Sequence, residues 1–117
     1  MKVLESKDCG NSPKNLFVQE MAVSFETGDL APDSATEELV FHDRSGEIGI
    51  NLTNPFPWLV DRAAPVEVHV LHASAHGRTG AANGVSTLED GAKHPFSYVF
   101  EFKNTTAKCV AAVYRYD

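Results

Sequence analysis

Three histidines lie close together in the middle of the chain, and imidazole is a side chain that commonly binds metal ions or moves protons near neutral pH. On a helix, His69, His72 and His76 would share one face, as a metal site requires. The segment around them is rich in β-branched residues, however, and on a regular strand only His72 and His76 lie on the same side. Two residues four apart on a strand are about 13 Å apart, too far to bind one ion without a bulge. We therefore predict no metal site and place His76 at a solvated strand end.

Two further features are typical of functional sites in other proteins, but their details argue against such sites here. The segment from Gly77 to Gly84 is similar to a phosphate loop, but it lacks the Gly-Lys-Ser/Thr ending and leads into a strand instead of a helix. Cys9 and Cys109 are the only cysteines, too few for a disulfide framework and wrongly spaced for a zinc knuckle. We interpret both as thiols, although a pairing between them stays open, and we expect no cofactor.

A helix over roughly 13–27 is the first element that must position functional side chains. Between 16 and 26 the apolar spacing fits a helix and a strand equally well, so the ends decide between them. Ser12-Pro13 is typical of an N-cap followed by proline at the first helical position, and Gly28 suits a left-handed C-terminal residue. A helix with these ends turns three residues inward: Phe17, Met21 and Phe25.

The rest of the chain predicts one short helix and six strands. Asn54-Pro55 repeats the cap-then-proline pattern and begins a short helix that ends at 63–65. Asp90-Gly91 is a strong hairpin signal, and Tyr98 shares a strand face with three phenylalanines. The predicted strands span 38–42, 47–50, 66–72, 81–89, 96–103 and 107–116. Helices followed by a run of hairpins predict an α+β fold with helices packed on one face of an antiparallel sheet.

Length and composition narrow the class of protein. The 117 residues correspond to one domain, 1–117, and 43% hydrophobic with 22% charged residues is ordinary for a globular protein. Sixteen acidic against ten basic residues give a net charge of −6, which argues against a partner that is a nucleic acid or an anionic membrane. The first eight residues contain no apolar run typical of a signal peptide or anchor. We therefore expect a cytoplasmic protein.

The order of the elements and several short strings resemble the SnoaL-like branch of the nuclear transport factor 2-like superfamily. These strings are Asp8-Cys9-Gly10-Asn11-Ser12-Pro13-Lys14-Asn15, Phe25-Glu26-Thr27-Gly28-Asp29, Thr36-Glu37-Glu38-Leu39-Val40-Phe41, and His76-Gly77-Arg78-Thr79-Gly80-Ala81-Ala82-Asn83-Gly84 followed by Phe100-Glu101-Phe102. The resemblance spans nearly the whole chain and implies a cone-shaped, curved antiparallel β-sheet, closed by N-terminal α-helices, that holds a pocket. The chain departs from the family between 51 and 65, where a longer helix is usual, so the lid of the pocket is not predicted.

The resemblance also implies a catalytic pair. In the ketosteroid isomerase members a carboxylate at the end of the first strand acts as a general base, and it corresponds to Asp43. A donor to the developing oxyanion, just before the late Phe-x-Phe, corresponds to Tyr98. The family's helix donor corresponds to Met21, which cannot donate, so steroid isomerisation itself is not expected. Two alternatives stay open: Asp43 begins a turn and can bond to local backbone amides, and Tyr98 can simply fill the cone.

The function implied is the binding of a small hydrophobic carbonyl or hydroxyl compound in the cone pocket. Its lining residues and those at its mouth are predicted to be Phe17, Met21, Phe25, Phe41, Trp58, His72 and Phe100. The implied activity is that of a cofactor-independent isomerase, dehydratase, cyclase or hydrolase; the alternative is a non-catalytic ligand-binding or dimeric interaction module. A homodimer through the sheet is expected because the last strand is apolar on both faces, with Val110, Ala112 and Tyr114 on one and Cys109, Ala111 and Val113 on the other.

Overall fold

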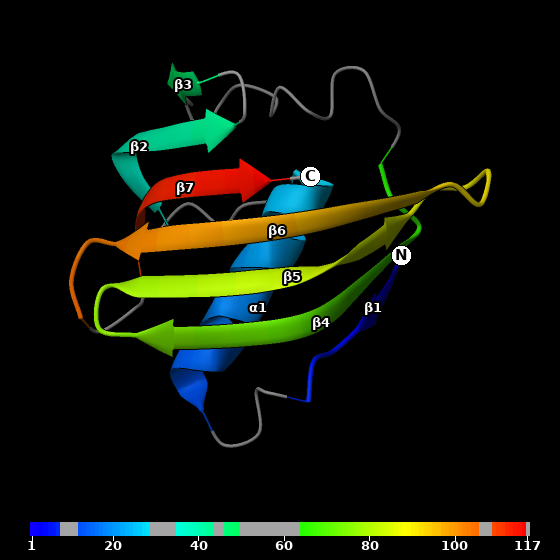
Figure 1. Ribbon diagram of the computed structural model, residues 1–117, viewed down its shortest axis with the longest axis horizontal. Coiled ribbons are helices and arrows are strands. Elements are labelled where there is room, and N and C mark those ends of the chain that lie inside the picture. The colour runs from blue at the N-terminus through cyan, green and yellow to red at the C-terminus, as the bar shows by residue number, and fades with distance from the viewer. Residues whose placement is uncertain (8–11, 29–34, 44–45, 50–63, 106–108, 117) are drawn as a thin grey trace.

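The computed structural model describes residues 1–7, 12–28, 35–43, 46–49, 64–105 and 109–116, and these ranges contain one α-helix and seven β-strands (Figure 1). In chain order the elements are β1 (Lys2–Leu4), α1 (Pro13–Thr27), β2 (Ala35–Asp43), β3 (Gly46–Gly49), β4 (Glu67–His76), β5 (Thr79–Thr87), β6 (Lys93–Phe102) and β7 (Val110–Tyr116). The second helix predicted after Asn54, with Trp58 on it, lies outside the described residues.

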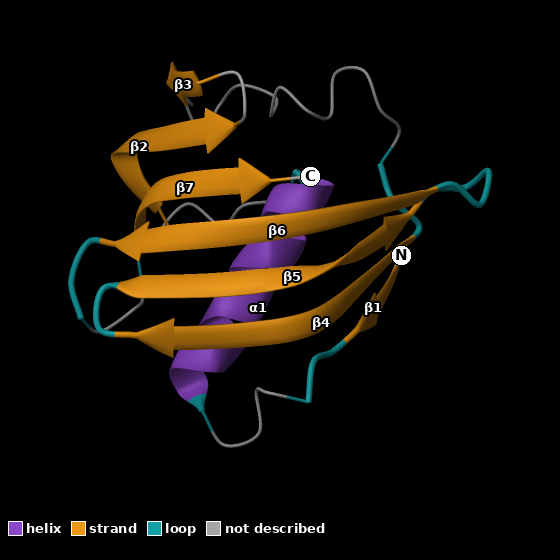
Figure 2. Cartoon of the chain, viewed as in Figure 1, coloured by secondary structure: helices purple, strands orange, loops and turns teal. Residues whose placement is uncertain are grey.

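The helix α1 begins and ends where its capping residues predicted. The Ser12 hydroxyl accepts a hydrogen bond from the Asn15 amide at 3.2 Å, and Pro13 occupies the first turn. Gly28 ends the helix with a left-handed φ of 79°, and its N–H donates to the Ser24 carbonyl at 2.8 Å. Figure 2 shows α1 lying diagonally across one face of the sheet, which we call the inner face.

The seven strands form one curved sheet in the order β1-β4-β5-β6-β7-β2-β3. The run from β4 to β7 is antiparallel, as predicted. The prediction of a purely antiparallel sheet needs correction at its two sides, because β1 pairs with β4, and β2 with β7, in parallel. Neither pairing is foreseeable from periodicity: β1 has only three residues, and β2 meets the last strand of the chain.

A hydrophobic core lies between α1 and the inner face of the sheet. Fully buried aromatic rings dominate it: Phe25 from the helix, Phe41 from β2, and Tyr98, Phe100 and Phe102 from β6. The ring of Phe25 lies 6.0 Å from that of Tyr98 and 5.9 Å from that of Phe100, measured between centroids. Burying each such side chain contributes about 1.5–3 kcal/mol to stability.

A β-bulge in β4 changes which side chains face outward. Val70 pairs with Gly84 and His72 with Asn83, so Leu71 is the extra residue. Gly84 is required there, because a Cβ atom would lie 2.1 Å from the carbonyl oxygen of His69. The bulge shifts the alternation of side chains by one residue, and His69 therefore lies on the same outer side as His72 and His76. The expectation that only the latter two share a face was wrong for this reason.

Candidate functional site

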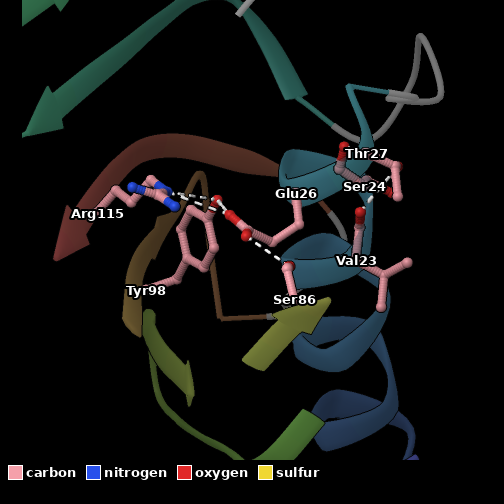
Figure 3. A network of polar contacts seen from close by, with 7 residues as sticks. All are labelled: Val23, Ser24, Glu26, Thr27, Ser86, Tyr98 and Arg115. Atoms are coloured by element: carbon pink, nitrogen blue, oxygen red, sulfur yellow. Dashed lines mark hydrogen bonds and ion pairs between the residues drawn. The ribbon is translucent and has the colours of Figure 1, made fainter. Parts of the chain in front are cut away.

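Four polar side chains from four elements meet under the inner face of the sheet (Figure 3). Glu26, near the end of α1, accepts a hydrogen bond from the hydroxyl of Ser86 on β5, at 2.8 Å through Oε1. Its Oε2 accepts from the hydroxyl of Tyr98 on β6 and from Nε of Arg115 on β7, the latter at 3.2 Å. Arg115 Nε also lies 3.1 Å from the Tyr98 oxygen. We call these four residues the Glu26 network.

Local structure explains why these side chains converge. Tyr98 and Arg115 are direct partners in the β6–β7 register, so both project from the same face of adjacent strands. The guanidinium carbon of Arg115 lies 5.8 Å from the centre of the Tyr98 ring, within the range of a cation–π contact. Glu26 follows Phe25 on the buried side of α1, and the Thr27 hydroxyl closes the last turn by donating to the Val23 carbonyl at 2.9 Å. The hydrogen bonds of Glu26 to side chains of β5, β6 and β7 hold this end of the helix against the sheet.

The network is sealed from solvent and contains one ion pair. Glu26, Ser86 and Tyr98 have no exposed surface, and Arg115 is 7% exposed. Burial raises the pKa of Tyr98 well above its usual value of about 10, the charge of Glu26 adds to the rise, and Arg115 offsets part of it. Burial alone lowers the pKa of Arg115, but Tyr98 and Glu26 outweigh that effect and the net pKa is raised. Tyr98 is thus a neutral phenol that donates to the carboxylate beside a charged guanidinium.

The raised pKa of Tyr98 predicts a loss of stability in alkali. The native state holds the phenol proton more tightly than the unfolded state, so this contribution is complete below about pH 10 and is lost as the pH rises toward the native pKa. We expect the free energy of unfolding to fall by up to about 1.4 kcal/mol per pH unit above pH 10 in the wild type, relative to Tyr98→Phe. Urea unfolding at pH 8.5 to 11 measures this, with the exposed Tyr116→Phe as the matched control. If the free energy of unfolding has the same pH dependence in the wild type and in Tyr98→Phe, this prediction is wrong.

The structure brings together most of the residues predicted to line a pocket. Tyr98 lies on the inner face, as predicted, but its hydroxyl donates to Glu26. Five predicted pocket residues pack in or against the same core: Phe17, Met21, Phe25, Phe41 and Phe100. His72 is instead exposed on the outer face. Asp43 ends β2 and pairs with Gly46, but its side chain, like Trp58, lies outside the described part.

Glu26, Ser86 and Arg115 were not predicted as site residues. Glu26 and Arg115 could have been identified as charged residues at positions where the periodicity of apolar residues predicts a buried side chain. Glu26 lies one turn after buried Ala22 in α1, and Arg115 lies two residues after buried Val113 in β7. Among the described residues, no cluster of three or more His, Cys, Asp or Glu side chains could hold a metal ion.

No protein-family profile matches the chain, and no curated protein matches it. Within the described residues, no helix is long and apolar enough to cross a membrane.

Comparison with solved structures identifies the fold. An NTF-2 like protein of unknown function from Burkholderia xenovorans has a TM-score of 0.65 and 15% identity, covering 88% of this chain and 79% of that one. A protein of Sinorhizobium meliloti described as a candidate polyketide cyclase has a TM-score of 0.60 and 14% identity, covering 91% and 96%. A de novo designed protein with a curved β-sheet has a TM-score of 0.68 and 12% identity, covering 88% and 83%. The chain therefore has the nuclear transport factor 2-like fold, as the resemblance implied.

Proposed function

We propose that this protein binds a small, largely apolar molecule in its cone, with the Glu26 network at the polar end of the site. The observation that carries the proposal is a carboxylate, a phenol and a guanidinium that share hydrogen bonds within an apolar interior. Burying such groups costs several kcal/mol per ion before pairing, and clusters of this kind are concentrated at functional sites. The likeness of fold to a candidate polyketide cyclase supports a small-molecule site, while the likeness to a designed protein shows that fold alone does not define one.

The proposed ligand carries a carbonyl or hydroxyl oxygen. Tyr98 and Arg115 are hydrogen-bond donors, so a ligand oxygen can replace the Glu26 carboxylate as the acceptor of the Tyr98 proton. Arg115 then remains as the partner of Glu26, and no charge is left unpaired. A phenol has a single O–H, and the ligand oxygen must therefore compete with Glu26 for it.

The proposed chemistry is cofactor-independent proton transfer beside that oxygen, in an isomerisation, dehydration, cyclisation or hydrolysis. Asp43 is the proposed base at the end of β2, and Tyr98 is the proposed donor to the developing oxyanion. Glu26 accepts the Tyr98 proton before the ligand binds, and in this scheme it remains paired with Arg115 once the ligand oxygen has taken its place. We also propose that the domain, 1–117, acts in the cytoplasm and binds neither nucleic acid nor membranes.

A thermal-shift screen with small hydrophobic ketones, and with alkanes of equal size, tests the ligand proposal. We expect ketones to raise the melting temperature and alkanes to have little effect. Tyr98→Phe should weaken the binding of a ketone about tenfold, the effect of one hydrogen bond, whereas the exposed control Tyr116→Phe should not. Asp43→Asn should retain binding and lower turnover of any substrate found about 100-fold or more. If Tyr98→Phe binds the ketone as tightly as the wild type, the Glu26 network is not part of the site. If Asp43→Asn turns over a substrate at the wild-type rate, Asp43 is not the base.

A second proposed function is self-association through the outer face of the sheet. His42 on β2 stacks on Tyr114 of β7, with ring centroids 4.4 Å apart, and Tyr114 donates to Glu101 of β6 at 3.2 Å. Ala112 lies on the same face but is only 8% exposed, so the half-buried rings of His42 and Tyr114 form the accessible part of this surface. We propose that a second copy of the chain packs on this surface; sedimentation velocity over a range of concentrations tests it.

A further inference from the structure

A hollow of about 370 Å³ opens on the outer face of the sheet, on the side opposite the Glu26 network. Its lining comes from four neighbouring strands: Leu71, Asn83, Gly84, Val85, Pro95, Phe96, Ser97 and Tyr116. Its volume falls within the usual range of small-molecule sites, about 300–1,000 Å³. Two of its apolar side chains are unusually exposed, Leu71 at 44% and Tyr116 at 53%. The β4 bulge is what places Leu71 at this hollow.

Strand register arranges the polar groups of the hollow in a row. Asn83 pairs with Ser97, and Ser97 pairs with Tyr116, so the three side chains stand on adjacent strands about 4.8 Å apart. An amide, a hydroxyl and a phenol can each donate and accept hydrogen bonds. Leu71, Val85 and Pro95 add apolar surface around this row.

The charge of the lining restricts the class of ligand. None of the described residues that line the hollow carries a formal charge, so an ionic ligand would lose its hydration without gaining an ion-pair partner. A purely apolar ligand would cover Asn83 and Ser97 without satisfying them. A molecule with neutral hydroxyl groups around its edge and C–H bonds on its faces meets both requirements, because its edge can bond to the polar row and its face can pack on Leu71 and the Tyr116 ring.

From this geometry we propose that the hollow binds a neutral hydroxylated ring, of which a pyranose sugar is the representative type. This site is separate from the cone. Its lining residues lie on four hydrogen-bonded strands of one sheet, with Leu71 at the β4 bulge, so the site is preformed and binding does not require the chain to reorganise. The proposal does not depend on the ligand or the chemistry proposed for the Glu26 network.

Titration of the ¹⁵N-labelled protein with methyl β-D-glucopyranoside tests the proposal, with cyclohexanol and benzoate as neutral and charged comparison rings. We expect saturable shifts of the Asn83, Val85 and Ser97 amides, with a midpoint on the order of millimolar and about tenfold lower than for either comparison ring. Asn83→Ala and Tyr116→Ala should each weaken binding about tenfold, while Ala81→Ser, on the same face outside the hollow, should leave it unchanged. The spectra of the variants also report whether they are folded.

Four results would overturn the proposal, and the first three are no saturation by the glucoside, equal or tighter binding of cyclohexanol or benzoate, and shifts confined to inner-face residues. A fourth is that Tyr116→Ala converts a dimer into a monomer in sedimentation velocity while glucoside has no effect, because the hollow would then be covered by a second copy. Tyr98→Phe distinguishes binding in the hollow from binding in the cone, because it should weaken the binding of a ketone and leave the binding of the glucoside unchanged.

Discussion

Arg115→Met is expected to lower the free energy of unfolding by about 3–5 kcal/mol. The substitution keeps most of the side-chain volume but removes the only guanidinium in the Glu26 network, where Nε lies 3.2 Å from Glu26 Oε2. Glu26 has no exposed surface, so water cannot replace the lost partner. The cost of an unpaired buried carboxylate then exceeds the cost of the lost contact itself. Urea unfolding at pH 7 measures the change.

Matched controls separate burial from charge in this experiment. Glu20→Gln and Arg78→Met change the same residue types at exposed positions, and each should alter stability by less than about 0.5 kcal/mol. Glu26→Gln combined with Arg115→Met removes both charges together, and it should recover at least about half of the loss caused by Arg115→Met alone. If the double variant is no more stable than the single one, the two side chains do not act as a pair, and the electrostatic account of the network is wrong.

Gly84→Ala is the second substitution with a large expected effect, a loss of about 3 kcal/mol or more. The new Cβ would lie 2.1 Å from the His69 carbonyl oxygen and 2.7 Å from the ring of Phe96. The first of these atoms belongs to the backbone of a neighbouring strand, so β4 and β5 must separate at the bulge before a methyl group can fit. Thermal or urea unfolding measures the loss, and the amide shifts of Leu71 and His72 report whether the bulge has moved.

Two other glycines provide graded controls. At Gly80 the nearest atoms to a new Cβ are side-chain atoms, Val18 Cγ2 at 2.6 Å and Phe102 Cζ at 2.9 Å, which can shift more readily than backbone. Gly77 has a φ of 60° and no atom within 4 Å, so alanine there should cost only about 1 kcal/mol of backbone strain. The expected order of destabilisation is Gly84, then Gly80, then Gly77. A Gly84→Ala protein as stable as Gly77→Ala would show that the close approach of the strands is not required.

The elements of the fold were largely predictable because their signals are local. Ser12, Pro13 and Gly28 define the ends of α1 through hydrogen bonds and dihedral angles within a few residues. The alternation of Phe96, Tyr98, Phe100 and Phe102 identifies the inner face of β6, and all four are buried there. The pairings of β1 with β4 and of β2 with β7 join strands that are distant in the chain, and no pattern of neighbouring residues predicts them.

The site was predicted only in part, for a related reason. Tyr98 was placed correctly on the inner face because one strand's alternation suffices to orient it. The partner of its hydroxyl was not predicted, since Glu26 is 72 residues away in the chain and Arg115 reaches both through the β6–β7 register. The outer hollow was also missed, because it depends on the bulge at Leu71 and on side chains from four strands.

The sequence by itself determined an α+β domain with a capped N-terminal helix, a run of antiparallel strands and an aromatic inner face. These properties follow from caps, turn residues and periodicity, whose energies arise between residues close in the chain. Only the tertiary structure decided that Glu26, Ser86, Tyr98 and Arg115 form one buried network and that three histidines share the outer face. The network depends on strand register, and the common face of the histidines depends on a single extra residue in β4. A shift of one residue in either would turn every affected side chain to the opposite face.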